Sequence, residues 1–327
     1  MGRELDDAVL AGDRRALARA ITLVESTRPE HRAQAESLLD AVLPATGGAR
    51  RIGISGTPGV GKSTFIEELG LRLVGHGQRI AVLAVDPSSA RTGGSILGDK
   101  TRMGDLSRRP DAFIRPSPSS GSLGGVARRT REALLLCEAA GFDVVLVETV
   151  GVGQSETAVA EICDLFLLLV APGGGDDLQG IKRGIMELAD VVAVNKADGE
   201  MAFAARHTAA DYRHALHLVR PKWPGRPTQV LSCSARTGDG LPAVWDALCE
   251  LHEELRGDGS LDALRRRQAV DAMWRDFDER LTRRYREDPA VARRATELER
   301  QVGDGERSPA SAVSALLGLD DAAGPRS

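Results

Sequence analysis

Short apolar runs alternate with longer helical patterns from residue 51 to residue 255, and this alternation limits the folds open to the chain. The apolar runs are RIGISG, RIAVLAVD, FDVVLVE, DLFLLLVAP, DVVAVNKAD and TQVLSCSA. Between them lie stretches with apolar residues at helical spacing, such as KSTFIEELGLRLVGHG, VARRTREALLLCEAAG, DLQGIKRGIMELA and LPAVWDALCELHEEL. Strands that are apolar at successive positions are buried on both faces. The pattern therefore predicts an α/β fold, a mostly parallel sheet with helices on both faces.

Helical patterns also flank this central region. Residues 1–45 repeat apolar positions every three or four residues, and Pro29 suits a helix start. Residues 45–48, Ala-Thr-Gly-Gly, are a candidate linker. We therefore expect an N-terminal helical segment (1–48), a central α/β domain (49–258) and a C-terminal helical arm (259–327).

The C-terminal arm carries an apolar face among many charged residues. Its acidic and basic residues are interleaved, which argues against a surface for nucleic acid. A helix that packs on another helix is the better interpretation, and a second subunit that supplies the other helix would make a homodimer. The apolar positions, at helical spacing, are Met273, Trp274, Phe277, Leu281 and Tyr285.

Charge and cysteine content exclude several other classes. The net charge of -4 argues against bulk attraction to nucleic acid or to an anionic membrane. No apolar run approaches the ~20 residues that span a bilayer, and the N-terminus has no signal-peptide pattern. The four cysteines form no CxxC pair and lie in apolar contexts, which favours buried thiols and a cytoplasmic location.

GTPGVGKS, residues 56–63, matches the phosphate-binding pattern G-x-x-x-x-G-K-[ST]. It follows a predicted strand and opens a predicted helix, which is the context that this motif requires. Glycines let successive N–H groups curl around phosphates, and the helix N-terminus adds partial positive charge. Lys62 would neutralise β and γ oxygens, and Ser63 would ligate Mg²⁺. The predicted phosphate-binding residues are Gly56, Thr57, Pro58, Gly59, Val60, Gly61, Lys62, Ser63 and Thr64.

NKAD, residues 195–198, predicts which base is bound. It ends an apolar run, so it lies at the carboxyl edge where α/β sheets bind ligands. Asp198 could accept hydrogen bonds from guanine N1–H and N2–H₂. Adenine lacks this pair of donors, so we expect GTP and GDP. Asn195 and Lys196 would brace the base and the phosphate loop, and SCSAR (232–236) could place the N–H of Ala235 near guanine O6. The predicted base-binding residues are Asn195, Lys196, Asp198, Ser234, Ala235 and Arg236.

Three acidic residues are candidates for a metal site. Asp86 and Glu148 each end an apolar strand, and Asp99 lies in a loop rich in Gly and Ser. Mg²⁺ prefers oxygen ligands, so these carboxylates and Ser63 are the predicted set. A helix cap or a surface charge is the alternative interpretation of each acid.

Two further glycine-rich loops follow predicted strands. In VETVGVGQSE (147–156), Val152 stands where many switch proteins have a Gln that orients the attacking water. We therefore expect slow hydrolysis by the isolated protein, with a partner supplying the missing positioning. GGGDDLQGIKRG (173–184) is either an ordinary strand-to-helix turn or a third mobile loop that moves Gln179 and Lys182 toward the nucleotide or a partner.

These motifs together resemble the MeaB/ArgK-type GTPases over roughly residues 50–240, with long matches in DPSSARTGGSILGDKTRM and APGGGDDLQGIKRGIMELADVVAVNKAD. The resemblance implies a SIMIBI-like P-loop fold and a C-terminal dimerisation arm. It also implies a chaperone that gates cobalamin loading and protects or reactivates adenosylcobalamin-dependent methylmalonyl-CoA mutase, or a related acyl-CoA mutase. The Mg²⁺ positions that it implies are Ser63, Asp86, Asp99 and Glu148, and its third mobile loop contains Gln179 and Lys182. The expected catalytic residues are Lys62, Asp86, Glu148, Gln179 and Lys182.

Two rival functions stay open at this point. Older descriptions of the family imply a kinase acting with a lysine/arginine/ornithine transport system, although NKAD favours guanine and no acceptor element is evident. A metal-insertion GTPase would need a His-rich tract or a Cys/His cluster, and the sequence has neither.

Overall fold

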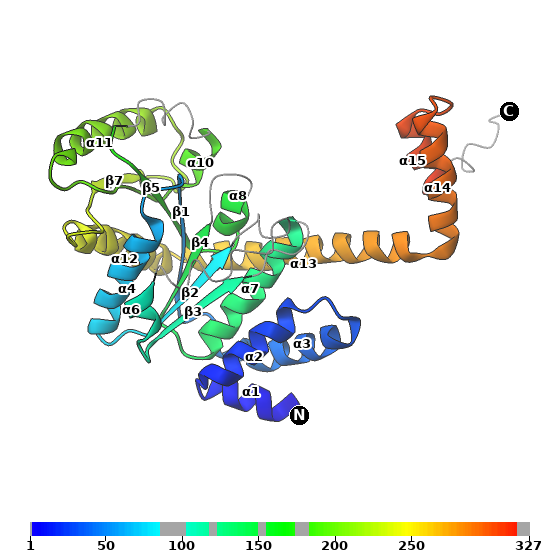
Figure 1. Ribbon diagram of the computed structural model, residues 1–327, viewed down its shortest axis with the longest axis horizontal. Coiled ribbons are helices and arrows are strands. Elements are labelled where there is room, and N and C mark those ends of the chain that lie inside the picture. The colour runs from blue at the N-terminus through cyan, green and yellow to red at the C-terminus, as the bar shows by residue number, and fades with distance from the viewer. Residues whose placement is uncertain (1, 86–102, 118–122, 150–154, 174–182, 319–327) are drawn as a thin grey trace. The chain divides into compact units, whose positions relative to one another are not determined.

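The structure is a computed structural model that describes residues 2–85, 103–117, 123–149, 155–173 and 183–318. Its centre is one seven-stranded sheet with the order β3-β2-β4-β1-β5-β6-β7, in which every neighbouring pair is parallel (Figure 1). The strands are β1 Arg50–Gly56, β2 Ile80–Val85, β3 Ala112–Ser117, β4 Val144–Thr149, β5 Leu165–Val170, β6 Val191–Val194 and β7 Gln229–Ser232. The predicted α/β fold with a parallel sheet is therefore confirmed.

Both faces of the sheet are covered, and for this reason β2, β4, β5 and β6 are buried at every residue. Alternate residues point to opposite sides. Val145 and Val147 belong to one core, whereas Val144 and Leu146 belong to the other. The helices that contribute to the first core are α1 Gly2–Leu10, α2 Arg14–Glu25, α3 Pro29–Val42, α7 Leu123–Ala139, α8 Ser155–Ala160, α10 Arg183–Leu188 and α11 Met201–His217.

The second core lies on the other face of the sheet. It is formed by α4 Lys62–Gly75, α6 Gly104–Ser107, α12 Leu241–Gly257 and the first turns of α13 Ser260–Glu287. In Figure 1, α4 and α12 lie on one side of the strands, and α7 lies on the other. Local sequence explains several boundaries. Asp13 caps α2 by accepting from the N–H of Ala16 at 2.7 Å, and Pro29 is the first residue of α3, as predicted.

The chain divides into two compact units, residues 1–268 and 269–327. The N-terminal helices share a core with the sheet and belong to the first unit. The division into three parts by function, with boundaries at residues 48 and 258, stays a prediction.

The second unit contains the later turns of α13, together with α14 Pro289–Gly303 and α15 Pro309–Leu316. Its small core consists of Leu298, Ala312 and Ala315, and the Tyr285 hydroxyl donates to the carbonyl of Leu316 at 2.5 Å. Tyr285 is thus partly buried within this unit. The other members of the predicted apolar face are more than half exposed, as is Val270: these are Met273, Trp274, Phe277 and Leu281.

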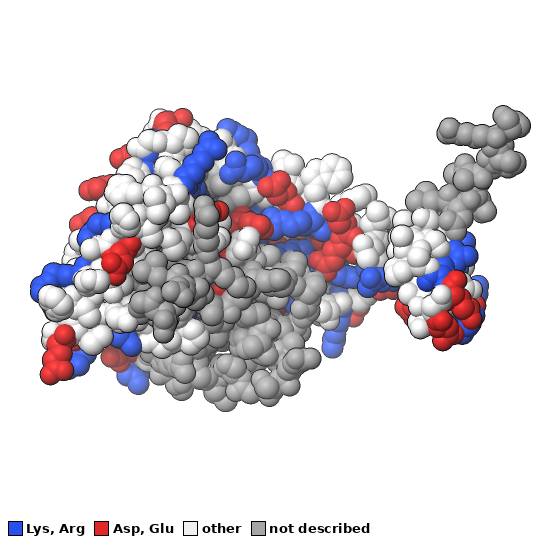
Figure 2. Space-filling view, turned by 90° about the horizontal axis from the view of Figure 1, so that it is seen from above, with Lys and Arg blue, Asp and Glu red and all other residues white. Residues whose placement is uncertain are grey.

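The pattern in the sequence did not predict β3, α6 and α8. Each is short, and β3 contains Pro116, which is tolerated because β3 is an edge strand. Charges are mixed over the surface: on the face shown in Figure 2, the described Lys and Arg side chains lie among Asp and Glu side chains. None of the described helices combines the length and the apolar character that crossing a bilayer requires.

Candidate nucleotide-binding site

The predicted phosphate loop connects β1, the central strand of the sheet, to the N-terminus of α4. Gly59 and Gly61 have φ values of 79° and 95°, a region that other residues adopt at a cost. A Cβ on Gly61 would lie 2.8 Å from Asn195 Nδ2, and one on Gly56 would lie 2.3 Å from the carbonyl oxygen of Leu169. The glycines are therefore required by the loop's own conformation and by close neighbours.

Lys62 is the first residue of α4, and its side chain folds back along the loop. Its ammonium donates to the carbonyls of Gly56 at 2.8 Å and Thr57 at 3.3 Å, and the residue is 9% exposed. These contacts hold a positive charge within the loop, which is the charge that a bound phosphate chain needs.

Ser63 and Glu148 meet across the sheet edge. The Ser63 hydroxyl donates to Glu148 Oε1 at 3.2 Å, and Glu148 is 3% exposed near the end of β4. This pairing brings together two of the four predicted metal ligands. Both are hard oxygen donors, so their chemistry fits Mg²⁺.

The remaining predicted metal ligands, Asp86 and Asp99, lie outside the described residues, as do Val152, Gln179 and Lys182. The strand β2 nevertheless ends at Val85, directly before Asp86, and Val85 pairs with Thr149, directly after Glu148. Among the described residues, no group of three or more His, Cys, Asp or Glu could hold a metal ion.

Asn195 connects the phosphate loop to the predicted base-binding loops. Its Nδ2 donates to the carbonyl of Val60 at 2.9 Å, and its Oδ1 accepts from the N–H of Ala235 at 2.9 Å. Lys196 donates to the carbonyl of Gly59 at 2.7 Å. Both side chains thus contact the phosphate loop, and their contact with the base stays a prediction. The Ala235 N–H is engaged by Asn195 here, so its contact with guanine O6 stays a prediction.

Asp198 lies beside these loops and is half-buried. Its Oδ1 accepts from the Ser234 hydroxyl at 2.6 Å, which orients the carboxylate. A cavity of about 650 Å³ adjoins it, a volume in the range of small-molecule sites. The cavity is lined by Gly61, Thr64, Glu67, Glu68, Asn195, Lys196, Asp198, Met201, Ala235 and Arg236.

Glu67, Glu68 and Met201 line this cavity but were missed in the sequence analysis. The signal for the two acids was available, because they follow Thr64 by three and four residues and so share a face of α4. Met201 opens α11 three residues after Asp198, where the sequence offers no pattern that separates a lining residue from a core residue.

Comparison with known proteins identifies the family of the chain. Residues 17–290 match the family model described as "Methylmalonyl Co-A mutase-associated GTPase MeaB". A Caulobacter vibrioides protein is 55% identical over 313 residues, 96% of each chain. The Escherichia coli "GTPase ArgK" is 52% identical over 271 residues, which cover 82% of this chain and 81% of that protein.

Two further relatives extend the comparison. A mouse protein, "Methylmalonic aciduria type A homolog, mitochondrial", is 47% identical over 322 residues, 94% of this chain and 77% of its own length. A solved structure described as "LAO/AO transport system kinase" superimposes with a TM-score of 0.78 at 37% identity, covering 98% of this chain and 97% of that chain. With its P-loop, its parallel sheet and its guanine-type loops, this chain belongs to the family of methylmalonyl-CoA mutase-associated GTPases.

Proposed function

We propose that this protein is a GTP-hydrolysing chaperone that gates cobalamin loading and protects or reactivates an adenosylcobalamin-dependent methylmalonyl-CoA mutase. Binding of a guanine nucleotide is supported by one observation. Asn195 bridges the phosphate loop and the Ala235 loop, and Asp198 lies beside this bridge. The description of the family and the name of the mouse relative support the mutase as partner.

Different residues of the site would bind the phosphates, the base and the metal ion. Lys62 would neutralise the phosphates, and Asp198 would accept from the guanine edge. Ser63 and Glu148 would hold Mg²⁺, and Asp86 and Asp99 would add oxygen ligands. When bound, Mg²⁺ would offset negative charge on the phosphates.

Slow basal hydrolysis follows from Val152, which cannot orient water as a Gln does. A bound mutase would supply the missing order, by placing the loop that contains Gln179 and Lys182 or by ordering residues 150–156. Turnover would then depend on docking of the mutase, and the chaperone would hold GTP until the partner arrives.

The experiment that tests this proposal is GTP hydrolysis by the purified protein, alone and with methylmalonyl-CoA mutase, with ATP as the control nucleotide. We expect slow turnover of GTP alone, acceleration by the mutase of at least about tenfold, and no comparable turnover of ATP. Lys182→Ala and Gln179→Ala would reduce the acceleration and leave GDP affinity unchanged. Equal rates with and without the mutase would rule out the coupling and direct attention to other acyl-CoA mutases.

A kinase acting with a transport system is the second candidate, because the solved relative carries that description. Labelled γ-phosphate distinguishes the two. A hydrolase releases the label as inorganic phosphate, whereas a kinase leaves it on an acceptor protein.

A further inference from the structure

The first two turns of α13 are fastened to the amino-terminal edge of the sheet, the edge opposite the nucleotide loops. Leu261, Leu264 and Gln268 are buried there, and Leu261 belongs to the same core as the sheet. The helix continues from this foot to Glu287, so its later turns belong to the C-terminal unit.

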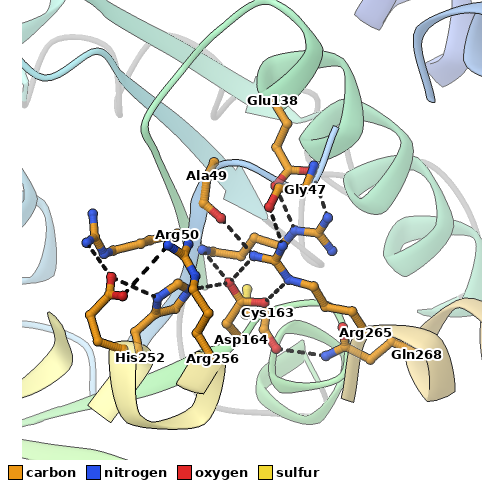
Figure 3. Close-up of polar contacts among 12 residues, drawn as sticks. Gly47, Ala49, Arg50, Glu138, Cys163, Asp164, His252, Arg256, Arg265 and Gln268 are labelled. Atoms are coloured by element: carbon orange, nitrogen blue, oxygen red, sulfur yellow. Dashed lines mark hydrogen bonds and ion pairs between the residues drawn. The ribbon is translucent and has the colours of Figure 1, made fainter. Parts of the chain in front are cut away.

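Arg265 supplies most of the polar contacts of this foot (Figure 3). Its Nε and Nη2 donate to the two carboxylate oxygens of Asp164 at 2.8 and 2.7 Å. Its Nη1 donates to the carbonyl of Gly47 at 2.6 Å, and its Nη2 also reaches the carbonyl of Ala49 at 2.8 Å. One guanidinium therefore joins α13 to the start of β5 and to the connection that precedes β1.

The neighbouring contact involves the residue before Asp164. Gln268 donates from Nε2 to the carbonyl of Cys163 at 2.7 Å. We call these four residues, Arg265 and Gln268 with Asp164 and Cys163, the α13 clamp. Arg265 and Gln268 are one helical turn apart on α13. They thus bind two residues that are adjacent in sequence, Asp164 and Cys163.

Asp164, the carboxylate acceptor of the clamp, is buried, and both of its oxygens accept hydrogen bonds. Asp164 has no exposed side-chain surface, and it also accepts from the N–H of Arg51 at 2.9 Å. Burial favours the neutral acid, but the bonds from Arg265 and His252 and the charges of Arg265 and Arg51 outweigh this and hold the pKa of Asp164 well below its usual range. A buried carboxylate with this many donors has a single arrangement of low energy.

A second buried pair reinforces the same region. Arg51 donates to both oxygens of Glu138 on α7, at 3.0 and 2.7 Å, and Glu138 also accepts from the N–H of Gly47 at 3.2 Å. Each of the two buried acids thus has an arginine partner, buried in the case of Arg51 and partly buried in the case of Arg265. Breaking one pair would leave its partner charged and uncompensated, so the two pairs together hold this region in one arrangement.

The turn held by the clamp lies at the far end of α8. This helix, Ser155–Ala160, is the next described element after β4, and Cys163 follows its last residue by three positions. It also packs tightly on β1, because a Cβ on Gly53 would lie 2.7 Å from Val159 Cγ1. The helix α8 therefore contacts β1 and β4, the strand that contains Glu148, and leads to the turn at the foot of α13.

We propose that the α13 clamp couples the nucleotide state of the GTPase site to the C-terminal helices, with α8 as the element between them. The inference rests on the proposed binding of GTP and GDP. It assigns Arg265 and Gln268 a positioning role far from the nucleotide, and they touch neither phosphate nor base. Loss of the clamp disconnects the C-terminal helices from the site without altering the site itself.

Amide hydrogen exchange over residues 269–303 tests this coupling, with the full chain bound to GDP or to a non-hydrolysable GTP analogue. The wild-type protein is expected to show a change in exchange rate of about tenfold between the two states, a scale that allosteric coupling commonly reaches. Gln268→Leu, and the charge-free pair Arg265→Met with Asp164→Leu, should reduce that change below about twofold. Affinity for both nucleotides should stay that of the wild type.

The matched control is Arg266→Met, an exposed neighbour on the same helix, which should keep the full change. Failure of the wild-type protein to bind GTP would overturn the proposed function and the coupling together. Normal binding with identical exchange in both nucleotide states would overturn the coupling alone. A full change in Gln268→Leu and in the paired variant would also overturn it.

Discussion

At the scale of single residues, the nucleotide cavity depends on Asn195. The residue is 1% exposed, and its amide is used at both ends, by the carbonyl of Val60 and the N–H of Ala235. Gly61 makes this possible because any Cβ at that position would press on Asn195 Nδ2. Gly61 and Asn195 are far apart in the sequence, yet they lie side by side in the structure.

Asp198 supports a prediction about base choice. In Asp198→Asn the side chain can accept only one hydrogen bond from the guanine edge and presents an N–H₂ to the guanine amino group. GTP affinity should therefore fall about a hundredfold, since bonds to charged acceptors are worth about 1.5–3 kcal/mol each. Xanthosine triphosphate carries a carbonyl in place of that amino group and should gain affinity. Calorimetric titration of both nucleotides measures this, with the exposed Glu200→Gln as control. Unchanged GTP binding would remove Asp198 from the base site.

Asp164 supports a prediction about pH. Its folded-state pKa is held below the unfolded value of about 3.9, so its ionised form stabilises the fold above about pH 4 and stops doing so as pH falls through the folded pKa. Asp164→Asn should lower the free energy of unfolding by about 3–5 kcal/mol at neutral pH, because Arg265 and Arg51 lose a buried counter-charge. The difference in the free energy of unfolding between the wild type and Asp164→Asn should stay constant from about pH 5 to 8 and become smaller below about pH 4.

Urea unfolding followed by circular dichroism across this pH range provides the measurement. Asp271→Asn removes an exposed acid on the same helix as Arg265, and this control should show almost no loss of unfolding free energy at any pH. A deficit that widens toward low pH would contradict the assignment of an ionised, arginine-bound Asp164.

At the scale of elements, α6 shows how a short helix is held. It has four residues, and Glu67 Oε1 accepts from the N–H groups of Asp105 and Leu106 at 2.9 and 3.2 Å. Leu106 fits against Gly70 of α4, where a Cβ would lie 2.5 Å from Leu106 Cδ2. The helix therefore depends on α4 rather than on its own hydrogen bonds.

Removal of this cap should cost stability. We expect Glu67→Ala to lower the free energy of unfolding by about 1–2 kcal/mol, the usual cost of a lost helix cap. Glu68→Ala is the matched control, because Glu68 forms only a partly exposed ion pair with Arg72 on the same helix and should change stability by less than about 0.5 kcal/mol. The midpoint of urea unfolding reports both, and equal effects would contradict the capping role.

The central strands β2, β4, β5 and β6 were predictable because they are buried at every residue and consist largely of apolar residues. The strand β1 was predictable because the phosphate-binding motif follows it. The edge strand β3 was missed because Arg115 and Pro116 interrupt its apolar pattern. In the site, the phosphate and base motifs were predictable because their chemistry is local in sequence. The α13 clamp was not predictable, because Arg265 and Asp164 lie 101 residues apart and no local sequence pattern indicates that they are in contact.

At the scale of the whole molecule, the exposed apolar face of α13 predicts self-association. Val270, Met273, Trp274, Phe277 and Leu281 are each more than half exposed, and Trp274 packs edge-on against Phe277 with ring centroids 5.7 Å apart. A contiguous apolar face of this kind marks a contact surface, and a second copy of the same helix offers the same face in return.

We therefore expect the full chain to sediment as a dimer in analytical ultracentrifugation. Trp274→Glu combined with Phe277→Glu should shift it to the monomer, because two charges would be buried unpaired at the contact. Arg284→Glu places an acid at an exposed position of the same helix and should leave the dimer intact. A wild-type protein that is monomeric at high concentration would exclude this face as a subunit contact.

The hydrogen bonds of the connection before β1 predict that this part of the chain resists proteolysis. Gly47 resembles a flexible link in sequence, yet its N–H donates to Glu138 and its carbonyl accepts from Arg265. A protease must draw a segment of chain into extended form, so it cannot cleave here while those bonds hold. Cleavage by trypsin beside Arg50 and Arg51 would thus report opening of the whole unit. A shortened protein that starts at residue 49 would leave Arg265 without one of its carbonyl acceptors.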